Sequence, residues 1–278
     1  MRKKIIGDSL TAESRVNFLE MKVRAAVTQR EHQSQIDAAR LNMRAGLVDL
    51  IFSIRIFKQK QAMAKKNLKI KVSTSIGSVS AICESTTKSK YIMTLAHGAG
   101  AGMNHIFMTQ LSEALAALEI ASLRFNFPFA ESKKGRPDSP AVAHQSIEAA
   151  IAKASKLFPS LPLFAAGKSF GGRMTSQYLS SHPESKVKGI IFYGFPLHAP
   201  GKPSIERADH LKDIKIPMLF LQGSRDELAR WDLIESVCSS LRKASLVRIE
   251  GANHMFKAGK KDLLPDLAKE TKDWISQL

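Results

Sequence analysis

The clearest chemical signal in this sequence is a serine flanked by glycines, in the Gly-x-Ser-x-Gly pattern of residues 167–171. An apolar run precedes the pattern and a helix-prone stretch follows it. On a sharp strand-to-helix turn the serine has a strained backbone, and the residues two positions away must lack a Cβ atom. Its hydroxyl then lies at a helix N-terminus, where free N–H groups favour a developing negative charge. The pattern therefore predicts Ser169 as a nucleophile.

A serine nucleophile needs a base that accepts its proton and a carboxylate that orients this base. When the serine lies on a strand–turn–helix, the acid and then the histidine are expected on loops after later strands. Asp226 follows the apolar run 216–222, and His254 follows the apolar run 246–250. These positions predict a catalytic triad of Ser169, Asp226 and His254. The alternative is that His254 is an ordinary solvated or capping residue of a loop.

A glycine-rich loop, residues 97–102, follows the apolar run Tyr91–Ala96. In the arrangement described above, one amide of such a loop and the amide after the nucleophile bind the oxyanion of the tetrahedral intermediate. We therefore predict that the backbone N–H groups of Ala99 and Phe170 form the oxyanion hole. The alternative is a phosphate cradle, but no Gly-x-x-x-x-Gly-Lys-Ser/Thr pattern follows the loop.

Four further side chains are candidates for substrate binding. Lys168 and Arg173 flank the nucleophile, and with Arg124 they could attract an acidic substrate to the mouth of the site. His97 is the fourth candidate, although a role in shaping the glycine-rich loop is the favoured interpretation. Arg173 also has a structural alternative, since it could tie the helix after Ser169 to a neighbouring loop.

The elements that must position these residues alternate between short apolar strands and helices from about Leu68 onward. Such alternation is typical of βαβ units, which build a mostly parallel sheet with helices on both faces. We predict about eight strands, opened by a hairpin, and no large cap domain, because the segment between Tyr193 and Met218 is too short for one. The strands are expected at residues 68–73, 78–84, 91–96, 120–125, 161–166, 189–193, 218–222 and 246–250. The helices are expected at residues 105–118, 141–157, 171–181, 232–241 and 262–275.

The overall composition suits one large domain with an appendage, since the chain has 278 residues, of which 44% are apolar and 24% charged. These values exclude a disordered chain, a collagen-like repeat and a disulfide-built miniprotein. We divide the sequence into a basic, helix-prone N-terminal extension, residues 1–66, and a domain, residues 67–278. The extension carries 14 basic and 6 acidic residues, or +8 of the total charge of +17. A tether to nucleic acid or to a membrane is one interpretation of this charge. However, no Trp or Tyr precedes Tyr91 to stack on bases, so we expect no specific nucleic-acid partner.

The cysteines and the apolar runs of the sequence indicate in which cellular compartment the protein is expected. Only two cysteines, Cys83 and Cys238, occur, and no Cys/His cluster suggests a metal site. No secretory signal is visible at the N-terminus. The longest apolar stretch, Ala45–Phe57, contains Asp49 and Arg55 and is too short to span a bilayer. We therefore expect a cytoplasmic protein with no transmembrane segment.

Six segments, residues 97–100, 123–128, 167–173, 193–198, 221–226 and 251–254, carry motifs in a characteristic order. These motifs resemble those of the α/β-hydrolase superfamily, and more narrowly of small dienelactone-hydrolase-like bacterial proteins. Those proteins are related to the hydrolase-like domain of a subunit of the eukaryotic non-specific-lethal histone acetyltransferase complex. The resemblance implies an α/β-hydrolase fold over about Leu68–Leu278 and leaves the extension unmatched. Dienelactone hydrolases have a cysteine nucleophile, so Ser169 argues against that activity here.

The function that these observations predict is hydrolysis of an ester or related acyl bond by a serine hydrolase, through an acyl-enzyme intermediate. Such chemistry needs no metal or organic cofactor, and the expected partner is a small-molecule acyl substrate. The alternative is a non-catalytic interaction module with the same fold, since a fold does not by itself determine function.

Overall fold

The computed structural model describes residues 21–22 and 63–278. The chain divides into two units, residues 1–58 and residues 59–278. Of the first unit only Met21 and Lys22 are described, both helical and exposed. Our prediction of a helix-prone extension therefore lies largely outside the described residues. The second unit holds the whole sheet and every candidate site residue.

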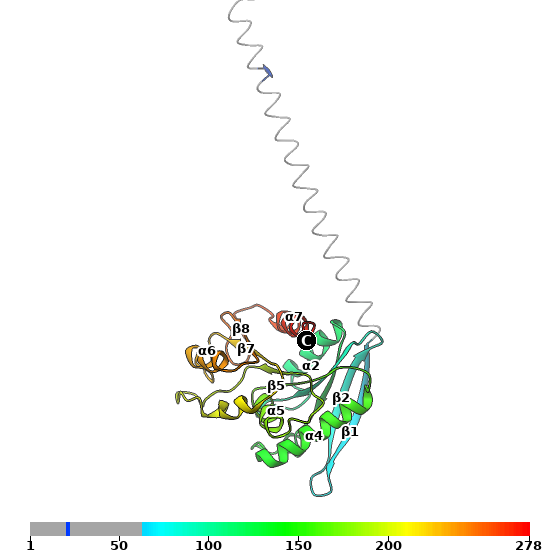
Figure 1. The fold of residues 1–278 in the computed structure, drawn as a ribbon. Coiled ribbons are helices and arrows are strands. Elements are labelled where there is room, and N and C mark those ends of the chain that lie inside the picture. Colours follow the sequence, from blue (N-terminus) through cyan, green and yellow to red (C-terminus); the bar gives the residue numbers. More distant parts are fainter. Residues whose placement is uncertain (1–20, 23–62) are drawn as a thin grey trace, which may run out of the picture. The chain divides into compact units, whose positions relative to one another are not determined.

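Eight strands form one sheet in the order β1-β2-β4-β3-β5-β6-β7-β8 (Figure 1). The opening hairpin and the pairing of β2 with β4 are antiparallel, whereas all pairs from β4 to β8 are parallel. The turn of the hairpin contains Gly77 at a φ of 84°, a value that favours glycine. This sheet confirms the predicted mostly parallel architecture. The strands are β1 (Met63–Ser73), β2 (Gly77–Thr86), β3 (Tyr91–Ala96), β4 (Ile120–Phe125), β5 (Leu163–Lys168), β6 (Ile190–Tyr193), β7 (Met218–Gly223) and β8 (Ala244–Ile249).

Helices cover both faces of the sheet, and each face has its own apolar core. On one face α2 and α7 supply side chains such as Leu111 and Leu267. On the other face the core contains Ile147 of α4, Met174 of α5 and Ile234 of α6. Each helix thus buries one apolar stripe, as its 3.6-residue periodicity requires. The helices are α2 (Ile106–Ala117), α3 (Pro128–Glu131), α4 (Pro140–Leu157), α5 (Phe170–Ser181), η1 (Glu206–Asp213), α6 (Trp231–Ser240) and α7 (Leu264–Ile275).

The strand order determines where a site can form. From β3 the chain moves to β4 on one side and then returns to β5 on the other side. At such a reversal the loops after the two strands diverge and leave a crevice at the carboxyl ends of the parallel strands. The glycine-rich loop after β3 and the serine after β5 both lie at this edge, because Ala96 pairs with Gly167.

Three features differ from the sequence-based expectations. Strand β1 begins at Met63, so four residues that we had assigned to the extension pair with β2, from Met63 opposite Thr86 to Lys66 opposite Cys83. The short helix α3 and the 3₁₀ helix η1 were not predicted. Helix α3 has four residues and η1 has eight, too few for a helical period to show clearly in the sequence.

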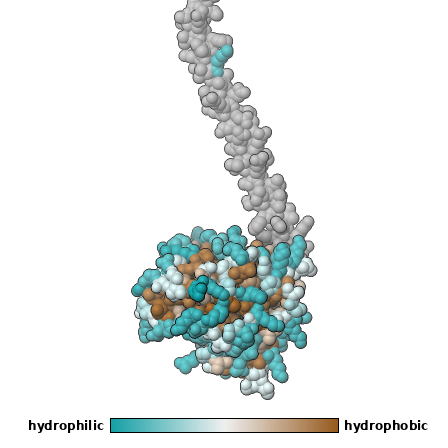
Figure 2. Space-filling model, in the orientation of Figure 1, coloured by the Kyte–Doolittle hydropathy of each residue, from teal (hydrophilic) through white to brown (hydrophobic). Residues whose placement is uncertain are grey.

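The surface of the described domain is mixed in character. On the face shown in Figure 2, hydrophilic side chains predominate and smaller apolar areas lie between them. Within residues 21–22 and 63–278, no helix is long and apolar enough to cross a membrane.

Candidate active site

Ser169 lies on a tight turn between β5 and α5, with φ 51° and ψ −117°. A positive φ is rare for a residue with a side chain and marks a strained position. At Gly167 and Gly171 other backbone atoms lie so close that a side chain would not fit. A Cβ atom on Gly167 would lie 2.3 Å from the Gly172 nitrogen, and one on Gly171 would lie 2.4 Å from the Ala96 carbonyl oxygen. The turn therefore requires glycine at both positions, as the sequence pattern indicates.

The three residues of the predicted triad lie together, although they come from loops far apart in the sequence. The Oγ atom of Ser169 is 2.8 Å from Nε2 of His254. On the other side of the ring, Nδ1 of His254 is 2.7 Å from Oδ2 and 2.9 Å from Oδ1 of Asp226. A carboxylate at Nδ1 stabilises the tautomer with a proton on Nδ1, which leaves Nε2 free to accept the serine proton.

Other hydrogen bonds hold the Asp226 carboxylate in place. The amide Nε2 of Gln222, at the end of β7, donates to Oδ2 at 2.6 Å. The backbone N–H of Leu228 donates to Oδ1 at 2.8 Å. Both Asp226 and His254 are buried. Donors on both oxygens hold the carboxylate beside the His254 ring, where it can stabilise the imidazolium of a reaction intermediate.

Lys168, the residue before Ser169, lies behind the triad rather than in the pocket. Its side chain is buried, and Nζ donates a 2.6 Å hydrogen bond to the backbone carbonyl of His254. The rings of Phe107 and Phe256 lie 5.9 Å and 5.3 Å from Nζ. Burial lowers the pKa of Lys168 to about 8, against the opposing effect of the Asp226 charge. The structure therefore does not support the predicted substrate contact for Lys168. Its side chain instead stabilises the loop that carries His254.

His97 is fully buried as well and fixes the loop after β3. Phe127 donates its backbone N–H to Nε2 at 3.0 Å, so the ring proton lies on Nδ1 and is donated to the Gly98 carbonyl at 2.8 Å. Burial lowers the pKa of His97 to about 4, so the ring stays neutral near pH 7. These contacts agree with the loop-shaping interpretation and leave the side chain no surface for a substrate.

Arg124 was also predicted at the mouth of the site, and the structure places it elsewhere. Its side chain is fully buried, with Nη2 2.7 Å from Oε1 of Glu84 and Nη1 donating to the Met103 carbonyl at 2.6 Å. Ser112 and Ser122 complete this buried network beside Glu84. A substrate contact for Arg124 is therefore wrong, because its charge is used to neutralise a buried carboxylate.

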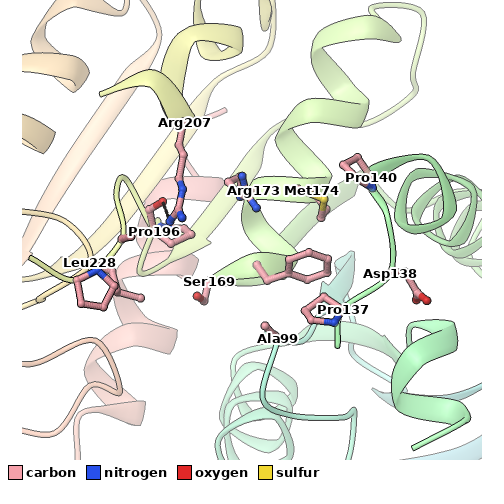
Figure 3. A pocket seen from close by; sticks show the side chains of 13 residues that line it. Ala99, Pro137, Asp138, Pro140, Ser169, Arg173, Met174, Pro196, Arg207 and Leu228 are labelled. Carbon is pink, nitrogen blue, oxygen red and sulfur yellow. Dashed lines mark hydrogen bonds between the residues drawn. The ribbon is translucent and has the colours of Figure 1, made fainter. Parts of the chain in front are cut away.

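A pocket of about 540 Å³ opens beside Ser169 (Figure 3). Ala99 and Phe170, the predicted oxyanion-hole residues, both lie at its wall. The backbone N–H of Ala99 donates no hydrogen bond to the described residues. Phe170 is the first residue of α5, so its N–H has no intrahelical acceptor. Among residues 21–22 and 63–278 neither amide donates a hydrogen bond, so both are available to a ligand. The pocket is lined by Ala99, Pro137, Asp138, Pro140, Ser169, Phe170, Arg173, Met174, Pro196, Ala199, Pro200, Arg207 and Leu228.

Of the four predicted substrate-binding side chains, only Arg173 lines this pocket. Arg207, on η1, lies there too, and sequence reasoning missed it. The only available signal was its place between β6 and β7, where loops approach the carboxyl edge of the sheet. In the described part of the chain, no group of three or more His, Cys, Asp or Glu side chains could hold a metal ion.

Comparisons with known proteins agree with this architecture. Residues 89–275 match the family described as alpha/beta hydrolase domain, and the chain belongs to this family. Among solved structures it is similar to dienelactone hydrolase from Anabaena variabilis, with 17% identity, a TM-score of 0.63, and coverage of 78% of this chain and 98% of that one.

Two further structures share the fold. A serine hydrolase without a lid from Xanthomonas campestris has 20% identity and a TM-score of 0.60, over 77% of this chain and 94% of that one. Est1E from Butyrivibrio proteoclasticus, solved with ferulic acid bound, has 16% identity and a TM-score of 0.61, over 76% and 98% of the two chains. At such identities the likeness describes the fold alone. The fold is that of the alpha/beta hydrolase family, and the described residues form no separate cap domain.

Proposed function

We propose that this protein is a serine hydrolase that cleaves a carboxylic ester or related acyl bond. The observation that carries the proposal is the continuous contact from the Ser169 hydroxyl through the His254 ring to the Asp226 carboxylate. A protein that serves only as a scaffold has no need for these three groups in line beside an open pocket. The alternative of a non-catalytic interaction module therefore has less support.

In the proposed mechanism Ser169 Oγ attacks the ester carbonyl carbon while Nε2 of His254 takes the hydroxyl proton. The amides of Ala99 and Phe170 bind the resulting oxyanion. The C–O bond to the leaving alcohol then breaks, and His254 returns the proton to that alcohol. Water attacks the acyl-enzyme in the same way, and His254 again accepts and returns one proton, which releases the acid and restores Ser169.

The substrate in this proposal is a small acyl compound, and the pocket volume of about 540 Å³ lies within the range of ordinary small-molecule sites. We propose no metal or organic cofactor, because none of the steps above requires one. We also propose that the protein is cytoplasmic. The two cysteines, Cys83 and Cys238, are unpaired and buried, which suits a reducing environment.

Turnover of p-nitrophenyl esters with acyl chains of increasing length tests the proposal. We expect hydrolysis by the wild type above the background rate, and none by Ser169→Ala. A chain-length optimum would measure the depth of the acyl pocket. The absence of turnover across the series, in a preparation that is folded by circular dichroism, would contradict the proposed activity on esters.

A further inference from the structure

Two arginines line the pocket without an acidic partner. Arg173 lies one turn after Ser169 on α5, and its backbone N–H donates to the Ser169 carbonyl at 3.0 Å. Arg207 lies on η1, and its Nη1 donates a long hydrogen bond of 3.4 Å to the Pro196 carbonyl. Within residues 21–22 and 63–278, neither guanidinium forms an ion pair with a carboxylate.

The environment of Arg173 leaves hydrogen-bonding capacity unused. Its Nε is buried and has no hydrogen-bond partner among the described residues. Burial and then the charge of Arg207 lower the pKa of Arg173, so the two guanidinium groups are close enough to repel each other. A guanidinium nevertheless remains protonated at neutral pH. The pocket is therefore lined by two positive charges that no carboxylate of the described residues pairs with.

The other polar groups near the two arginines do not neutralise them. Asp138 also lines the pocket, but it accepts the Phe129 backbone N–H at 2.9 Å, and Figure 3 shows it at the opposite end from Arg207. His210 pairs through Nε2 with Ser176 Oγ at 2.7 Å. Burial, together with the charge of Arg173, lowers the pKa of His210 to about 4, so its ring is neutral near pH 7. The three acidic residues of η1, Glu206, Asp209 and Asp213, are exposed.

We propose that Arg173 and Arg207 form an anion subsite, and that the preferred substrate is an ester that also carries a carboxylate or phosphate group. This inference rests on the proposed hydrolase function. Arginine binds either anion with two parallel hydrogen bonds. In a half-buried pocket such a pair is screened less than at an open surface.

The position of Arg173 relative to Ser169 also limits where the anion lies in the substrate. One helical turn separates the two residues, a rise of about 6 Å along α5. The anionic group must therefore be separated from the scissile carbonyl by several bonds. Half-esters of longer dicarboxylic acids meet this requirement better than succinate or oxalate half-esters do.

Matched pairs of esters test the subsite. One pair has the anion on the acyl side, p-nitrophenyl hydrogen adipate against its methyl ester. The second has it on the alcohol side, 4-acetoxybutanoate against its methyl ester. In at least one pair we expect the wild type to prefer the anionic ester about tenfold or more in kcat/KM, and Arg173→Gln and Arg207→Gln each to remove this preference. The control Arg242→Gln removes one exposed positive charge outside the pocket and should keep the preference.

The two proposals fail in different ways. Equal turnover of anionic and neutral esters by the wild type would overturn the subsite and leave the hydrolase function intact. If no ester is turned over, binding still tests the subsite through the melting temperature of Ser169→Ala. Monomethyl adipate or butyl phosphate should raise this temperature, the more effective of the two identifying the anion, and the added Arg207→Gln change should remove the rise. No shift with either compound would overturn the subsite.

Discussion

At the scale of single residues, the proposed chemistry depends on both nitrogens of His254. Nε2 contacts the nucleophile, and Nδ1 is held by a carboxylate that itself accepts hydrogen bonds from Gln222 and Leu228. Because each contact determines the protonation of the next, the three side chains act as a unit. Their removal should therefore be strongly non-additive.

Substitutions in the triad should separate activity from stability. Ser169→Ala and His254→Ala should each lower kcat by about 10⁴–10⁶-fold, and Asp226→Asn somewhat less, because the carboxamide favours the wrong imidazole tautomer. The melting temperature of Ser169→Ala should stay near that of the wild type, because only a hydroxyl at the pocket wall is lost. Steady-state kinetics and thermal melts measure both effects, with the exposed Ser240→Ala as control. A Ser169→Ala variant that keeps about a thousandth of the activity or more would rule out this nucleophile.

Lys168 should make stability depend on alkaline pH. Its pKa is about 8 in the folded protein, below the ordinary lysine value of 10.5, so the unfolded chain binds more protons between these values. The free energy of unfolding should therefore rise by about 2 kcal/mol from about pH 7 to about pH 10, relative to Lys168→Met. Urea unfolding of both proteins over this range measures the difference. A constant difference between them would contradict the buried, charged state of Lys168.

At this scale the sequence predicted which three side chains lie in contact beside the pocket, but not where the charged groups around them lie. The Gly-x-Ser-x-Gly pattern and the expected order of acid and base were enough to select Ser169, Asp226 and His254, whose catalytic role stays a prediction. The burial of Lys168 and Arg124 depends on packing between distant strands and helices, and one sequence has no local signal for it. Arg207 was missed for the same reason, since no motif distinguishes it from the other arginines.

At the scale of elements, the turn between β5 and α5 positions the nucleophile by close backbone contact. Gly171→Ala would place a Cβ atom 2.4 Å from the Ala96 carbonyl oxygen, which is backbone and cannot move aside. We expect a loss of about 2–4 kcal/mol in the free energy of unfolding and a displaced Ser169 with little activity. Gly135→Ala is the matched control, since a Cβ there meets nothing within 4 Å. Chemical unfolding that gives equal stability for the two variants would disagree with this account of the turn.

A further prediction concerns the buried ion pair of Glu84 and Arg124, which joins β2 to β4. Among the described residues, Arg124→Met leaves the buried Glu84 carboxylate with only the exposed Lys65 ammonium, 3.5 Å away, as a charged partner, and should lower the free energy of unfolding by about 3–5 kcal/mol. The double variant Glu84→Gln with Arg124→Met should recover much of this loss. Protein that remains folded should keep its KM for esters. A raised KM with unchanged stability would instead indicate that Arg124 contacts the substrate.

Element types were readable from the sequence because each buried strand is a short apolar run and each long helix has an apolar stripe. All eight strands were expected near their observed positions. The order β1-β2-β4-β3-β5-β6-β7-β8 was not, because strand order is determined by which crossovers pack together rather than by the composition of any one strand. The lengthened start of β1 at Met63 was missed because Lys65 and Lys66 lie on an exposed edge strand, where polar residues are ordinary.

At the scale of the whole molecule, residues 63–278 supply an eight-stranded sheet with helices on both faces. They also contain all three residues of the proposed triad. We therefore propose that a chain beginning at Met63 folds and hydrolyses esters as the full chain does. Its melting temperature should lie within a few degrees of the full-length value, and its kcat/KM should be unchanged. Thermal melts and ester kinetics on both chains test this. Aggregation, or lost activity in a folded protein, would show that residues 1–62 cover the core or the pocket.

The most direct test of the central claim is reaction with a fluorophosphonate, followed by intact mass and peptide mapping. The proposal predicts one adduct per chain, on Ser169. Ser169→Ala should form no adduct, and His254→Ala should react far more slowly, because the hydroxyl loses its base. An unreactive wild type, or equal labelling of the Ser169→Ala variant, would contradict the assignment of Ser169 as the nucleophile.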